Sequence, residues 1–131
     1  MSYRNSQDFL ATAEDVNDNT TAVNGTDFTS REINISDWWS QGSITVWFTP
    51  AVPAAVAVDF EFQVSSDGGT SWSSAYYVKI SEDSNQTQDG SGVVRTTTEV
   101  NFFGISHIRL YRIVVGNGAG NCTVMNARIA C

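Results

Sequence analysis

The feature that most constrains the fold is an alternation of large apolar side chains with smaller or polar ones over residues 55–64. Its apolar positions are Val56, Val58, Phe60, Phe62 and Val64. Side chains two residues apart lie on the same face of a β-strand. This period therefore predicts a strand with one buried face.

The same period recurs through the rest of the chain after residue 31. Strands are expected around residues 33–36 and 43–49, and over 73–80, 93–101, 106–115 and 122–130. Turn segments rich in Gly, Pro and Asp separate them. In 106–115 the apolar phase slips between Leu110 and Tyr111, which predicts a bulge or burial on both faces. The pattern predicts an all-β protein, an antiparallel β-sandwich of jelly-roll-like outline.

Composition narrows the classes of function. The 131 residues suffice for one domain, and a formal net charge of −7 disfavours nucleic acid and anionic membranes as partners. One His and one Lys offer little for catalysis, so we expect no enzyme, no catalytic residues, no cofactor and no metal. The sequence shows no secretory signal or membrane-spanning run. Cys122 and Cys131 fall nine residues apart in one expected strand, so free thiols are predicted.

Residues 1–30 differ from the remainder because their apolar side chains show no sustained period. Three structures are compatible with this segment: a solvated tail, a short helix over residues 6–16, or an arm that orders on a neighbouring subunit. We favour the arm, with Phe9, Leu10 and Phe28 as its anchors on the partner. The expected division is an arm over 1–30 and a sandwich over 31–131.

One short motif runs from residue 65 to residue 72 and resembles an Asp-box, a hairpin turn that is structural in the proteins known to contain it. The matching residues are Ser65, Asp67, Gly68, Gly69 and Trp72. We expect the Asp67 carboxylate to accept hydrogen bonds from turn amides, the glycines to adopt positive φ, and Trp72 to pack beneath the turn.

Three tryptophans are candidates for ligand or protein contact. Trp47 is out of phase with its apolar neighbours, and Trp38 and Trp39 must point to opposite sides if extended. Exposed Trp serves as a sugar platform or a protein contact, although a second sheet or the arm would also cover these rings. For Asp59 and Glu61, which share one strand face, a solvated surface is favoured over a glycosidase pair.

Taken together, the hairpin over residues 60–72, the strand pair over 108–129 and the polar amino-terminal extension resemble small β-sandwich virion proteins of tailed bacteriophages. The resemblance implies a capsid decoration (cement) protein of the virion, assembled in the host bacterial cytoplasm. Its expected partners are the major capsid protein or other virion subunits, and it is expected to be a homo-oligomer such as a trimer. The alternative is a carbohydrate-binding or receptor-binding module, including a tail or fibre accessory protein, in which exposed Trp side chains bind a glycan.

Overall fold

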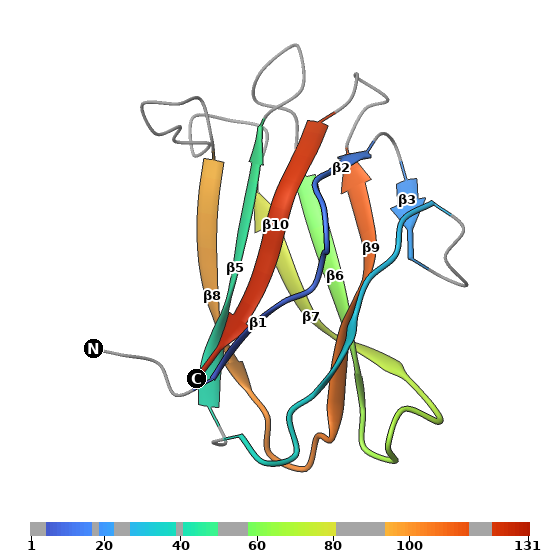
Figure 1. The fold of residues 1–131 in the computed structure, drawn as a ribbon, viewed down its shortest axis with the longest axis vertical. Helices are drawn as coiled ribbons and strands as arrows, with labels where there is room; N and C mark the ends of the chain where they lie inside the picture. Colours follow the sequence, from blue (N-terminus) through green and yellow to red (C-terminus); the bar gives the residue numbers. More distant parts are fainter. Residues whose placement is uncertain are drawn as a thin grey trace.

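The computed structural model describes residues 5–16, 19–22, 27–38, 41–49, 58–80, 94–115 and 122–131. They form two antiparallel sheets that pack face to face (Figure 1). One sheet contains β1 (Ser6–Asp8), β2 (Glu14–Val16), β5 (Gln41–Thr49), β8 (Val94–Asn101) and β10 (Cys122–Ala130). The other contains β3 (Asn19–Thr21), β4 (Glu32–Asn34), β6 (Val58–Ser65), β7 (Ser73–Ile80) and β9 (His107–Val115). The described part of the chain has no helix long and apolar enough to cross a membrane.

The order of the strands is that of a jelly roll. β1 and β2 pair with successive parts of β10, and β3 and β4 pair with successive parts of β9. When each of these pairs is counted as one interrupted strand, the two sheets have the orders 1-8-3-6 and 2-7-4-5. This arrangement confirms the all-β antiparallel sandwich predicted from the alternating sequence.

The core lies between the sheets and is built from the apolar faces of the long strands. Ile44, Val46 and Phe48 of β5 are completely buried, as are Phe60 and Phe62 of β6. The rings of Phe48 and Phe60 meet across the two sheets with centroids 5.8 Å apart. The period-two pattern therefore identified this buried surface correctly.

The predicted irregularity in the strand after residue 106 is a β-bulge. In the pairing of β6 with β9, Glu61 lies opposite Arg112 whereas the next residue, Phe62, lies opposite Leu110. Tyr111 is thus the extra residue on β9, and it lets Leu110 and Ile113 both enter the core.

The structure corrects the interpretation of residues 1–30 as an arm separate from the sandwich. Their described parts supply β1, β2 and β3, which are paired within the two sheets. Phe9, Leu10 and Phe28 are 0%, 3% and 3% exposed and belong to the core of their own chain. At the strand interruptions the backbone N–H of Arg31 donates to the carbonyl oxygen of Phe9 at 2.8 Å, which joins the two edge segments. The three apolar residues are buried here because they fill the core where the edge strands break.

Candidate functional site

Three segments meet at one end of the sandwich, the lower end in Figure 1. They are the turn from β6 to β7, the turn from β8 to β9, and the residues that follow β4. The backbone N–H of Ile35 donates to the carbonyl oxygen of Ser106, and the N–H of Ser106 donates to that of Ser65, both at 2.8 Å. Hydrogen bonds therefore hold together the segments next to β4, β6 and β9 at this end, and the β8–β9 turn connects them to the other sheet.

The β6–β7 turn is organised around the Asp67 carboxylate. Its Oδ1 accepts hydrogen bonds from the backbone N–H groups of Thr70 and Ser71 at 3.1 and 2.9 Å, and from the Ser65 hydroxyl. The Ser71 hydroxyl donates to Oδ2. These bonds, above all the one from the Ser71 hydroxyl, hold the pKa of Asp67 well below its ordinary value. Gly68 and Gly69 have φ of 77° and 92°, which other residues adopt at a cost.

Trp72 fixes this turn to the sheet. Its indole N–H donates to the carbonyl oxygen of Gly69 at 3.1 Å, and the Arg109 guanidinium lies 4.1 Å from its ring centroid. Arg109 also donates to the side-chain oxygen of Gln63 and forms an ion pair with Glu32 at 3.4 Å. The Arg109 side chain thus ties β4, β6 and β9 together, and Trp72 of the motif at residues 65–72 packs on it.

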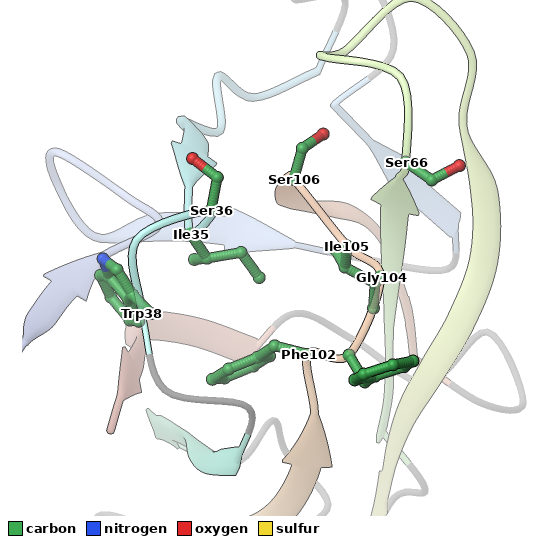
Figure 2. Close-up of a pocket in the computed structure, with 9 residues that line it drawn as sticks. Ile35, Ser36, Trp38, Ser66, Phe102, Gly104, Ile105 and Ser106 are labelled. Carbon is green, nitrogen blue, oxygen red and sulfur yellow. The ribbon is translucent and has the colours of Figure 1, made fainter.

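A pocket of about 350 Å³ opens beside this turn, and Figure 2 shows the residues that line it. Trp38 lies on one side and Ile105 on the other, with Phe102 near the base. The Trp38 and Phe102 rings meet edge to face with centroids 6.3 Å apart. Trp38 therefore lies at a concave site, as a ligand-contacting residue would, although it also packs against the core.

Two serine hydroxyl groups of the pocket lining are engaged in hydrogen bonds. The Ser36 hydroxyl donates to Asn34 Oδ1 at 2.6 Å, and the Ser106 hydroxyl donates to the carbonyl oxygen of Ser65 at 3.1 Å. None of the lining residues carries a charge. The pocket is therefore an uncharged site whose lining exposes polar and apolar surface in about equal measure.

Phe103 forms the rim of the pocket and is 86% exposed. The Asn101 side-chain oxygen accepts a hydrogen bond from the Phe103 backbone N–H at 2.9 Å, and Gly104 turns the chain with φ of 76°. Sequence reasoning missed this residue. The available signal was a Phe-Phe-Gly sequence directly after a strand, where a turn must expose one of two adjacent aromatic rings.

Trp47 belongs to β5 and lies on the outer face of the sheet that contains β5, β8 and β10. Its ring is partly covered. The Arg95 and Arg128 guanidinium groups lie 5.5 and 5.3 Å from its centroid and come from the two strands that flank β5. Arg128 also forms an ion pair with Asp8 at 2.7 Å, which lowers the pKa of Asp8. Trp39 lies outside the described residues.

The remaining titratable candidates are held in local contacts. Glu61 is 7% exposed and pairs with Arg112 at 2.6 Å, which corrects the expectation that it lies on a solvated face. The His107 Nδ1 lies 3.1 Å from the Ser106 hydroxyl oxygen, and Cys131 carries a free thiol. Among the described residues, no group of three or more His, Cys, Asp or Glu side chains could hold a metal ion.

The fold and its surface define a jelly-roll β-sandwich with an uncharged pocket at one end. No protein-family model matches the chain, and no curated protein matches it. Among solved structures, the chain is similar to the crystal structure of the infectious bursal disease virus VP2 subviral particle, with a TM-score of 0.52 and 12% sequence identity. The match covers 96% of this chain and 32% of the VP2 chain, so this chain spans about a third of the length of that viral capsid protein. The likeness is one of fold.

Proposed function

We propose that this chain is a structural protein of a virus particle, and more specifically a capsid decoration protein on the outside of an assembled shell. The observation that carries the proposal is the jelly-roll order, matched over 96% of the chain to a viral capsid protein. Jelly rolls are a recurring architecture of viral capsids, and also of lectin domains. The test must therefore measure association with particles directly.

The charge of the chain supports a place on the outer surface. Its 14 acidic residues outnumber its 7 basic ones and give a net charge of −7. A subunit that faced packaged nucleic acid would bind it better with a net positive charge, because phosphate contacts need Lys and Arg. An external position keeps this acidic chain away from the nucleic acid.

The contact with the shell has to come from the folded surface, because Phe9, Leu10 and Phe28 are buried in their own core. The outer face around Trp47 is the best candidate. There Trp47 lies with Arg95 and Arg128, and Trp and Arg are the residue types enriched at the energetic centres of interfaces. Arg128 is paired with Asp8, so the positive charge of this patch rests mainly on Arg95, and it fits an acidic surface of the capsid subunit.

Density-gradient fractionation of a lysate from the native source, with mass-spectrometric counting of the chain in each fraction, tests the proposal. Banding with nucleic-acid-filled particles, at a copy number comparable with that of the shell subunit, supports decoration. A handful of copies per particle would indicate a tail, neck or fibre part instead. Chain found only as free protein at the top of the gradient would overturn the virion role, and glycan binding by Trp47 would then be measured.

A second experiment tests the contact surface. Arg95→Glu reverses a charge next to Trp47, so we expect at least a tenfold loss of particle-bound chain when purified protein is added to undecorated shells. Glu99→Gln is the matched control, because Glu99 is exposed on the same strand. Equal binding by the Arg95→Glu variant and the wild type would exclude the Trp47 patch as the contact.

A further inference from the structure

We propose that the open edge of β8 binds an extended segment of a partner protein, which adds to the sheet as an antiparallel strand and presents a cation opposite Glu99 and a carboxylate opposite Arg95. The proposal is independent of the virion role. β8 is the last strand of its sheet and lies at its outer edge (Figure 1). In the described part of the chain it pairs with β5 alone, over its whole length. An open edge of this kind is a template for strand addition.

The backbone groups that β8 offers to a partner follow from its hydrogen bonds. The Tyr76 hydroxyl accepts a hydrogen bond from the N–H of Asn101 and donates one to its carbonyl oxygen, so both groups point away from β5. In an antiparallel pair, such residues alternate with residues that bond to the neighbouring strand. The N–H and carbonyl groups of Arg95, Thr97 and Glu99 therefore also point outward. No hydrogen bond between described residues reaches them.

The far side of the same sheet gives the same assignment. The N–H of Phe9 donates to the carbonyl oxygen of Ala127, and Cys131 exchanges two hydrogen bonds with Asn5, so the odd-numbered residues at this end of β10 face β1. The even-numbered residues there bond to the odd-numbered residues of β5. The even-numbered residues of β5 are left to bond to the even-numbered residues of β8. The odd-numbered residues of β8 thus point outward.

The side chains of β8 determine which segment fits. Arg95, Thr97 and Glu99 are exposed on the outer face, and no ion pair between described residues includes either charge. Opposite charges directly across two strands stabilise the pair, and like charges destabilise it. A strand centred opposite Thr97 is therefore favoured when it reads, from its amino end, basic–x–neutral–x–acidic. Its two intervening residues lie beside the half-buried Thr96 and Thr98, which favours β-branched apolar side chains.

The net charge of the chain selects a different protein as the partner. A second copy of β8 carries the same order of charges, from Arg95 to Glu99. However, each copy has a net charge of −7, so two copies repel each other over the rest of their surfaces. A partner of neutral or positive net charge makes the same backbone and side-chain contacts without that repulsion.

Amide hydrogen exchange of the free full chain, followed by nuclear magnetic resonance, tests the open edge. We expect the amides of Arg95, Thr97 and Glu99 to exchange at least about tenfold faster than those of Thr96 and Thr98, which bond to β5. Protection of the three outward amides in the free chain would overturn the proposal, because the edge would already be covered. A dimer in sedimentation velocity that protects these amides would assign the edge to a second copy and would overturn the choice of partner.

A synthetic peptide with blocked ends and the sequence Thr-Lys-Val-Thr-Val-Glu-Thr is the probe for binding. We expect it to bind the wild-type chain with a dissociation constant at or below about 1 mM and to slow exchange at the three outward amides. The matched control peptide exchanges the Lys and the Glu, which places like charges across the antiparallel pair. It should bind at least about threefold more weakly. No binding at ~1 mM peptide, or equal binding of the two peptides, would overturn the proposal.

A pair of variants at Thr97 tests whether the peptide uses the backbone of β8. Thr97→Pro removes the central outward N–H at an edge position, where a sheet tolerates proline, and should weaken peptide binding at least about tenfold. Thr97→Ala keeps that N–H and loses the same hydroxyl contact with Thr45, so it is the matched control and should bind like the wild type. Equal peptide binding by the two variants would overturn strand addition. Urea unfolding checks both folds, and the comparison of the two peptides decides the proposal if Thr97→Pro does not fold.

Discussion

The hydroxyl group of Tyr76 accepts a hydrogen bond from the backbone N–H of Asn101 at 3.0 Å and donates one to the carbonyl oxygen of the same residue. Tyr76 belongs to β7 and Asn101 to β8, which are edge strands of different sheets. One side chain therefore joins the two sheets where both have an open edge. Unpaired edge groups are sites of unwanted strand pairing, so this bridge also protects the edge.

Replacing Tyr76 by Phe removes both hydrogen bonds and keeps the ring. We expect the free energy of unfolding to fall by about 1–3 kcal/mol, because each such bond usually contributes about 0.5–1.5 kcal/mol net. Urea denaturation of the full chain measures it. Tyr77→Phe is the control on the adjacent exposed residue and should change stability by no more than about 0.5 kcal/mol. Equal stability of the two variants would mean that the bridge contributes nothing.

The burial of Phe9 makes residues 1–30 necessary for folding. Phe9 is fully buried, and its ring lies 5.1 Å from that of Phe62 in the opposite sheet. Phe9→Ala is expected to cost about 3–5 kcal/mol, a large share of the ~5–15 kcal/mol that stabilises a typical domain. Deletion of residues 1–30 should leave a chain without cooperative thermal unfolding. Gln7→Ala, at an exposed position of β1, is the control and should unfold like the wild type.

A truncated chain that kept cooperative unfolding and its β-sheet circular dichroism would contradict this prediction. That result would support the interpretation of residues 1–30 as an arm separate from the sandwich.

The sequence predicted the long strands because alternation is a local property that eight or nine residues display clearly. Strands over 73–80 and 122–130 have the same bounds in the structure as the pattern indicated. The edge segments β1 to β3 have three residues each, which is too short for a period to be visible, whereas the alternation of Ile33 and Ile35 did indicate β4. Their burial is decided by β9 and β10, about a hundred residues away in the chain, and no local signal reports that pairing.

The candidate site was predictable in its parts and unpredictable as a whole. The hydrogen bonds at Asp67 follow from the spacing of turn residues. Trp38 was singled out because it and the adjacent Trp39 must point to opposite sides of an extended chain. The pocket needs Trp38, Ser66 and Phe102 from three segments, and only the tertiary fold brings them together.

The pair of Glu61 and Arg112 is sensitive to removal of one partner. Their side chains are 9% and 38% exposed, and the Ser74 hydroxyl also donates to Glu61. Arg112→Met leaves a mostly buried carboxylate unpaired, so we expect a loss of about 1–2 kcal/mol, less than the ~3–5 kcal/mol of a fully buried pair. The double variant Glu61→Leu with Arg112→Met should recover most of it. Urea denaturation of Glu61→Leu alone completes the cycle, and single losses that add up to the loss of the double variant would show that the two residues are not coupled.

Gly42 is required by the close approach of β5 to β10. A Cβ atom there would lie 2.2 Å from the carbonyl oxygen of Ala130 and 2.8 Å from Cε2 of Phe102. Gly42→Ala must therefore shift backbone, and we expect a loss of about 1–3 kcal/mol in thermal or urea unfolding. Ser43→Ala, one residue along the same strand, should change stability by no more than about 0.5 kcal/mol. A Gly42→Ala variant as stable as this control would show that the strands are spaced more widely.

The lowered pKa of Asp67 predicts a specific response to acid. A carboxylate whose folded pKa lies below its unfolded value of 3.8 contributes stability above that value, and the contribution is lost as pH falls toward the folded pKa. Asp67→Asn removes that contribution, so the variant is less stable than the wild type at neutral pH. The gap between their free energies of unfolding narrows below about pH 4. Asp8 also has a lowered pKa through Arg128, but it is common to both proteins and cancels in the difference. Urea denaturation of both proteins from pH 7 down to about pH 2 measures this gap, and one that stays constant with pH would contradict the role of the ionised carboxylate in the turn.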